Sequence, residues 1–61
     1  RRGLKRMDVR RYVVYLVEAD YGARKPREYV ADVLQRFSDL TKDETKQLKL
    51  FVGSQRKKAA M

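Results

Sequence analysis

The 61-residue chain contains no cysteine and no histidine, and it has a single proline. Without cysteine there are no disulfide bonds, thiolate nucleophiles or thiolate metal sites, so the fold needs no oxidising compartment. Without histidine the chain lacks the commonest general base and the commonest metal ligand. We therefore expect that the protein is not an enzyme and that it holds no metal ion and no cofactor.

Long hydrophobic segments are also missing. The longest unbroken apolar run, Tyr12–Val17, is six residues long, whereas a helix that spans a membrane needs about 20. The basic first residues are not followed by the apolar stretch of a signal peptide. The sequence therefore predicts no membrane partner and an intracellular location, in the cytoplasm, the nucleoid or the nucleus.

What the chain has in excess is positive charge, with 16 Lys and Arg against 8 Asp and Glu and a net charge of +8. The charge is concentrated at the two ends: residues 1–11 carry +5, residues 12–41 carry −1 and residues 42–61 carry +4. A nearly neutral middle between two basic ends is typical of a protein that binds a polyanion.

Periodicity divides the chain into a basic arm and one helical domain. Residues 1–7 have four cations and no helical spacing of apolar positions, which predicts a flexible arm. Asp8 is the expected N-cap of the first helix, because its carboxylate can accept free amide hydrogens. Residues 8–61 are expected to form a single domain with helices at about 9–21, 26–37 and 42–58.

Each predicted helix has apolar residues at the i, i+3, i+4 spacing of a buried face. These residues are Val9, Tyr12, Val13, Leu16, Val17 and Ala19 in the first, Val30, Val33, Leu34 and Phe37 in the second, and Leu48, Phe51 and Val52 in the third. Gly22 is expected to end the first helix, and Pro26 fits the first position of the second. Asp32 and Arg36 are spaced for a favourable i,i+4 pair.

The start of the third helix has its own signal. Thr41 and Glu44 match a capping box, in which each side chain satisfies a backbone amide. Three helices with a short second connection predict a small all-α three-helix bundle of helix-turn-helix or homeodomain-like outline.

The outline is similar to a homeodomain in its basic arm, its length and its basic last helix, which ends in Gln55-Arg56-Lys57-Lys58. That resemblance implies DNA binding through the last helix. The Trp-Phe-x-Asn-x-Arg run of the family is absent, however, and Phe51-Val52-Gly53-Ser54 stands in its place.

The alternative fold is a ribbon-helix-helix dimer. The segment Arg10–Val17 is rich in β-branched and aromatic residues, which favour strands. In that fold the segment would pair as a strand across the dimer and contact DNA.

Five basic residues of the third helix fall within about one third of its circumference, beside the apolar face, namely Lys42, Lys46, Lys49, Arg56 and Lys57. Gly53 lies in the same sector, where the missing side chain would let another backbone approach closely. We expect a nucleic-acid-binding module, for DNA rather than RNA, that contacts phosphates with low sequence specificity. The candidate contacts are Arg1, Arg2, Lys5, Arg6, Arg10, Arg11, Lys42, Lys46, Lys49, Arg56, Lys57 and Lys58.

The alternative function is a protein-interaction bundle that docks an acidic segment of a partner protein. Tyr12, Val14 and Tyr15 are its candidate apolar contacts. Tyr15 points away from the predicted core, so it could instead stack on a base.

Overall fold

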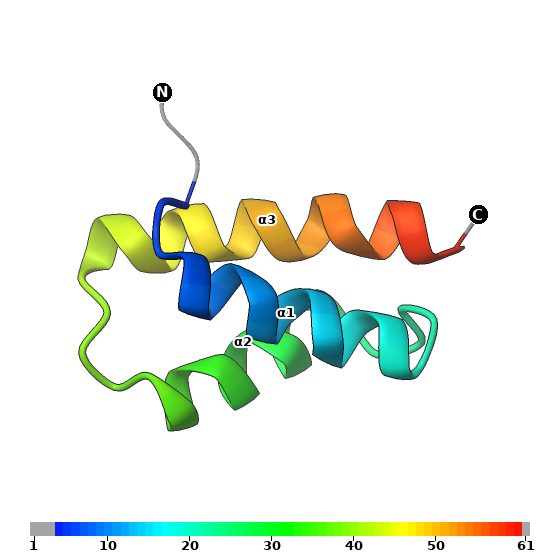
Figure 1. Ribbon diagram of the computed structural model, residues 1–61, viewed down its shortest axis with the longest axis horizontal. Coiled ribbons are helices and arrows are strands. Elements are labelled where there is room, and N and C mark those ends of the chain that lie inside the picture. The colour runs from blue at the N-terminus through cyan, green and yellow to red at the C-terminus, as the bar shows by residue number, and fades with distance from the viewer. Residues whose placement is uncertain (1–3, 61) are drawn as a thin grey trace.

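The structure, a computed structural model, describes residues 4–60 (Figure 1). It contains three helices, α1 (Met7–Ala19), α2 (Pro26–Arg36) and α3 (Lys42–Ala60), and each packs against the other two. The prediction of an all-helical bundle is confirmed. The ribbon-helix-helix alternative is wrong, because Arg10–Val17 lies inside α1 and residues 4–60 form no strand.

The start of α1 corrects the predicted N-cap. Arg6 occupies the N-cap position, and Asp8 lies in the first turn. There the Asp8 carboxylate accepts a hydrogen bond from its neighbour, the backbone N–H of Val9, at 2.9 Å. A carboxylate in the first turn also interacts favourably with the positive end of the helix dipole.

The end of α1 is a Schellman turn that comes slightly earlier than predicted. The N–H of Gly22 donates to the carbonyl of Val17 at 2.9 Å, and the N–H of Tyr21 donates to the carbonyl of Glu18 at 3.4 Å. Tyr21 and Gly22 both have left-handed backbones, with φ of 56° and 71°. In this motif, glycine is normally preferred at the first of these two positions, which is occupied here by Tyr21.

The other helix ends agree more closely with the sequence. Pro26 lies at the start of α2, as expected. The capping box of α3 is confirmed, because the N–H of Glu44 donates to Thr41 Oγ1 at 3.1 Å and the N–H of Thr41 donates to Glu44 Oε1 at 2.9 Å. The helix continues to Ala60 without a break at Gly53.

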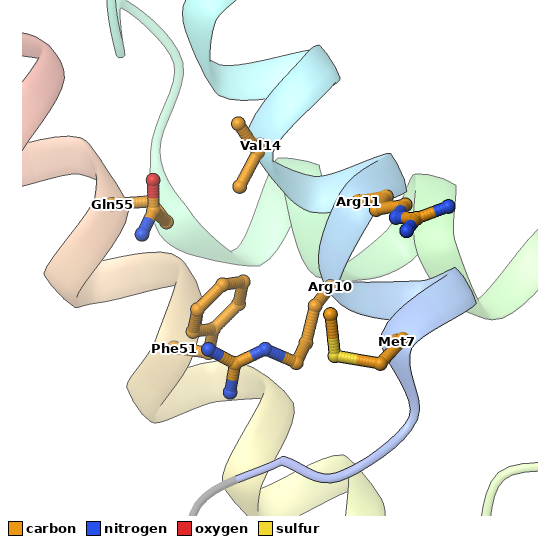
Figure 2. A pocket seen from close by; sticks show the side chains of 6 residues that line it. All are labelled: Met7, Arg10, Arg11, Val14, Phe51 and Gln55. Carbon is orange, nitrogen blue, oxygen red and sulfur yellow. The ribbon is translucent and has the colours of Figure 1, made fainter.

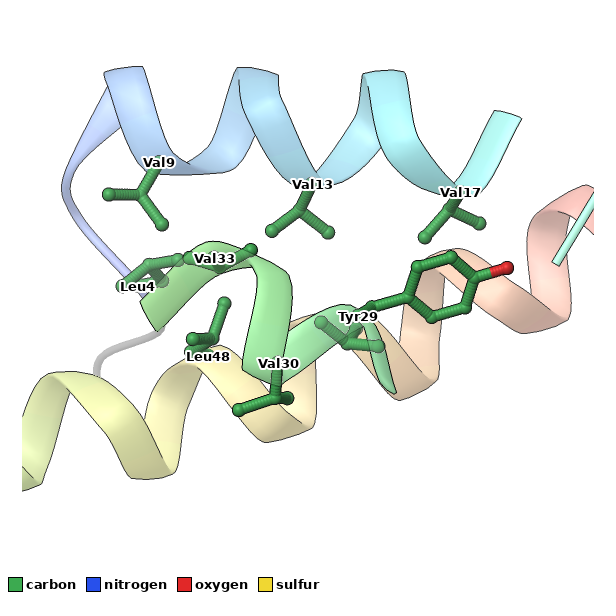
Figure 3. Close-up of a cluster of buried hydrophobic side chains, with 9 residues drawn as sticks. Leu4, Val9, Val13, Val17, Tyr29, Val30, Val33 and Leu48 are labelled. Atoms are coloured by element: carbon green, nitrogen blue, oxygen red, sulfur yellow. The ribbon is translucent and has the colours of Figure 1, made fainter. Parts of the chain in front are cut away.

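The core lies between the three helices, with Val9, Val13 and Val17 of α1 directed at α2 and α3 (Figure 3). The buried residues are Leu4, Val9, Val13, Val17, Tyr29, Val30, Val33, Leu48 and Val52. Tyr12, Leu16, Leu34, Phe37 and Phe51 pack against them, as predicted, with part of each side chain exposed. Ala19, also predicted for the core, is exposed.

Two buried residues were not predicted. Leu4, inside the segment expected to be an arm, is only 3% exposed, so the core extends toward the N-terminus beyond Asp8. Tyr29 is fully buried, and its hydroxyl donates to the Asp20 carboxylate and accepts from the backbone N–H of Arg24. The hydrogen bond from Tyr29 lowers the pKa of Asp20, and burial raises the pKa of the Tyr29 phenol.

The predicted Asp32–Arg36 pair is wrong. Asp32 pairs instead with Arg24, at 3.1 Å. The Arg36 guanidinium lies over the rings of Tyr12 and Phe37, 5.2 and 5.9 Å from their centroids. A guanidinium stacks favourably on an aromatic face, so Arg36 covers the aromatic edge of the core.

Candidate nucleic-acid interface

The structure separates the predicted phosphate contacts into two groups. Lys5, Arg6, Arg10 and Arg11 belong to the N-terminal segment and α1, and the remaining described contacts belong to α3. Arg1 and Arg2 lie outside the described residues.

Three of the predicted contacts hold the fold together. Arg6 forms ion pairs with Asp8 at 2.9 Å and with Asp39 at 3.1 Å, and hydrogen bonds to these carboxylates raise its pKa. Arg10 lies 4.6 Å from the centroid of the Phe51 ring and donates to the Leu4 carbonyl at 2.8 Å.

Arg56 is the third. Its Nε donates to the carbonyl of Gly22 at 3.3 Å, which ties α3 to the turn between α1 and α2. Its side chain is consequently less available to an outside partner than those of the lysines beside it.

The lysines of α3 have a different environment. Lys42, Lys46, Lys49, Lys57 and Lys58 are exposed, and none forms an ion pair within residues 4–60. At about 100° per residue, the first four fall within about 80° of the helix circumference, whereas Lys58 is about 100° away from Lys57. We call the surface of Lys42, Lys46, Lys49, Leu50, Gly53 and Lys57 the lysine face.

A depression lies in the middle of the lysine face. Its lining is Lys49, Leu50, Gly53, Ser54 and Lys57, and its volume is about 440 Å³. Apart from its chain neighbours and the backbone of α3, a Cβ atom placed on Gly53 would meet no atom of residues 4–60 within 4 Å. Leu50 beside it is 69% exposed, which was not predicted from the sequence.

Within the described chain, the glycine that another part of the backbone approaches closely is Gly22. A Cβ atom on Gly22 would lie 3.3 Å from the carbonyl oxygen and 3.4 Å from the Cα of Arg56. Gly22 therefore lets the α1–α2 turn pack against the backbone of α3, whereas Gly53 faces open space within the described chain.

A second depression, of about 310 Å³, lies between α1 and α3 (Figure 2). Its lining is Met7, Arg10, Arg11, Val14, Phe51 and Gln55. Val14 was expected to line an apolar groove, but Tyr12 and Tyr15 are not among its lining residues. Tyr12 packs edge-on against Phe37, at 5.7 Å between ring centroids.

The α1 arginines and the lysine face lie on different sides of α3. Phe51 faces the groove toward α1, and Lys46, Lys49 and Lys57 lie about 120–160° around the helix from it. The arginines of α1 and the lysine face therefore do not form one continuous surface, so the candidate interface is the lysine face of α3 alone.

Acidic residues do not gather into a metal site. Within residues 4–60 no three of the Asp and Glu side chains come together as a ligand set. Asp39 pairs with Arg6, and Glu44 completes the cap of α3. None of the described helices combines the length and the apolar character needed to cross a membrane.

Comparisons with known proteins give no match, either to a protein-family model, to a curated protein or to a solved structure.

Proposed function

We propose that the protein is a nucleic-acid-binding module, for DNA rather than RNA, that contacts phosphates through the lysine face of α3. The observation that carries this proposal is the alignment of Lys42, Lys46, Lys49 and Lys57 on one exposed face, with no ion-pair partner within residues 4–60. Cations held in a row by a helix can neutralise successive phosphates and release their counterions.

The same face supports low sequence specificity. Base edges are read mainly by paired hydrogen bonds in the major groove, from Arg or Lys to guanine and from Asn or Gln to adenine. The lysine face contains no Arg, Asn or Gln, so its lysines are the side chains that could reach base edges. Contacts to phosphates position a protein on the duplex but carry no direct information about sequence.

Salt dependence gives the first test. Four neutralised phosphates on duplex DNA predict a slope of about −3.6 for the logarithm of the association constant against the logarithm of salt concentration. Fluorescence anisotropy with a labelled 20-base-pair duplex, titrated at several salt concentrations, measures this slope. Affinity that does not change between low and moderate salt would contradict the proposal.

A pair of matched variants tests the location. The double variant Lys46→Ala, Lys49→Ala removes two charges from the lysine face and should reduce the slope by about 1.8. The control Lys25→Ala, Arg27→Ala removes two charges from exposed positions at the start of α2, and its slope should stay near that of the wild type. Equal effects of the two variants would show that net charge alone determines binding.

The N-terminal arginines provide a further comparison. Deletion of Arg1 and Arg2 also removes two charges, but the sequence predicts a flexible arm, and ordering such a segment on binding costs entropy. The lysines of α3 are already aligned on a helix, so their contacts carry a smaller ordering cost. We expect the deletion to weaken binding less than the Lys46→Ala, Lys49→Ala variant does, and a larger effect of the deletion would assign the main contact to the arm.

The groove between α1 and α3 supports the second candidate function, docking of an acidic segment of a partner protein. Its apolar part is formed by Met7, Val14 and Phe51, and Arg10 and Arg11 border it (Figure 2). That combination suits a segment with alternating apolar and acidic side chains. NMR titrations distinguish the two functions, because a docked acidic peptide shifts the amide signal of Val14, whereas a duplex shifts those of the lysine face.

A further inference from the structure

Gly53 lies in the interior of α3, where glycine is unfavourable. Relative to alanine it lowers helix stability, because its backbone loses more freedom on folding. At Gly22 the positive φ and the nearby backbone of Arg56 explain the glycine. Neither reason applies to Gly53, since its φ is not positive and no described atom lies within 4 Å of a Cβ placed there.

The neighbours of Gly53 indicate what kind of molecule fits beside it. Lys49 and Lys57 lie four residues before and after it on the same face, about 6 Å away in each direction along the helix axis. Leu50 and Ser54 complete the depression. A shallow surface with a cation at either side and a missing side chain at its centre is complementary to a linear polyanion.

We infer that the depression over Gly53 receives the sugar-phosphate backbone of a double-stranded nucleic acid. One strand crosses α3 at Gly53, and Lys49 and Lys57 contact its phosphates from the two sides. Exposed Leu50 covers apolar sugar atoms of the same strand. This inference rests on the proposed function and adds the form of the nucleic acid and the point of closest approach.

The composition of the face favours a duplex over a single strand. Proteins that bind single strands combine basic grooves with aromatic side chains on which the bases stack. The lysine face has no aromatic residue, and Phe51 lies on the side of α3 toward the groove with α1. The contacts available on this face are therefore those that a paired backbone offers.

The missing side chain matters because lysine–phosphate hydrogen bonds are short, about 2.7–2.9 Å between nitrogen and oxygen. A side chain at position 53 would hold the strand away from the helix and lengthen the hydrogen bonds on both sides. No described atom of the free protein would clash with a side chain at position 53. Substitution of Gly53 with alanine should therefore stabilise the fold but weaken binding.

The test uses Gly53→Ala and Gly53→Leu, with Ala31→Leu as the control for an added apolar side chain at an exposed position of another helix. We expect Gly53→Ala to raise Tm by about 4 °C, because alanine is the better helix former. The same variant should weaken binding to a 20-base-pair duplex about threefold, and Gly53→Leu about tenfold, with a salt slope smaller by about 0.9 for each phosphate that the lysines no longer neutralise. Ala31→Leu should leave duplex binding unchanged.

The outcomes separate this inference from the proposed function. If Lys46→Ala, Lys49→Ala weakens duplex binding but both Gly53 variants bind like the wild type, the inference is wrong and the proposed function stands. If a single strand of equal length binds more tightly than the duplex, the assignment of a double-stranded partner is wrong. If the wild type binds neither the duplex nor the single strand, both proposals fail.

Discussion

Replacement of Gly22 with alanine is expected to remove about half of the stability of this domain. Gly22 lies in the turn after α1 with φ of 71°, and it is buried against α3. Its N–H donates a hydrogen bond to the Val17 carbonyl, and its carbonyl accepts one from the Arg56 guanidinium. A side chain at this position therefore disturbs the packing of the turn against α3.

The magnitude follows from two costs and one smaller gain. An L-residue in the left-handed region costs about 1–2 kcal/mol. The added Cβ would lie 3.3 and 3.4 Å from backbone atoms of Arg56. Because these contacts are only slightly short, the overpacking costs about 1 kcal/mol, the lower end of the usual range. Restriction of the unfolded chain by alanine offsets about 0.4–1 kcal/mol. The sum is a loss of about 2 kcal/mol, which is large beside the roughly 3–5 kcal/mol that a core of this size supplies.

Thermal and urea unfolding, followed by far-ultraviolet circular dichroism, measure the effect. A loss of about 2 kcal/mol corresponds to a Tm lower by about 10 °C in a domain of this size. Gly53→Ala is the matched control, since the same chemical change there should raise Tm. If Gly22→Ala unfolds at the wild-type temperature, the close approach of the turn to Arg56 does not constrain the fold and the reasoning is refuted.

Three further substitutions test the turn and the N-terminal segment. Tyr21→Gly should raise the free energy of unfolding by about 1 kcal/mol, because it relieves a left-handed backbone at a residue that is 78% exposed; an unchanged urea midpoint would contradict this. Leu4→Ala should lower the free energy of unfolding by about 2–3 kcal/mol in the same assay, as expected for a buried leucine, whereas a residue outside the core would show almost no effect. Tyr29→Phe should make the free energy of unfolding fall less steeply as the pH is lowered. The lowered pKa of Asp20 contributes stability above its unfolded pKa of about 3.9, and that stability is lost as the pH falls through the folded value. Loss of the Tyr29 hydroxyl moves the folded pKa toward its usual value, so an unfolding profile below about pH 5 as steep as that of the wild type would exclude this hydrogen bond as the main cause.

The sequence predicted those parts of the fold that depend on local interactions. Pro26 and the pair Thr41 and Glu44 mark the starts of α2 and α3, because the groups they satisfy lie within one turn of the chain. The burial of Leu4 could not be predicted in the same way, because Leu4 has no periodic neighbours. Tyr29 lies four residues before Val33, so its burial agrees with helical spacing, but the hydrogen bond from its hydroxyl to Asp20 across the α1–α2 turn depends on the tertiary structure.

The candidate site was predictable to a similar extent. Helical spacing places Lys42, Lys46, Lys49 and Lys57 of α3 on one face regardless of the tertiary structure. Arg6 pairs with Asp39, which is 33 residues distant, and Arg56 donates to Gly22, which is 34 residues distant. No local pattern reveals these two contacts. For the same reason, the sequence does not show which of the two glycines, Gly22 or Gly53, packs against another helix.

The arginines that stack on aromatic rings and the lysines of the lysine face lie in different parts of the fold. The Arg10, Arg24 and Arg36 guanidinium groups lie over aromatic rings, so their replacement by lysine would remove planar stacking even though the charge stays the same. Lysines of the lysine face stack on no ring within residues 4–60, so their substitution alters the electrostatic field around the protein but leaves its packing intact. Association rates with a polyanion respond to that field. The encounter rate and the folding stability of this domain can therefore change independently, through different residues.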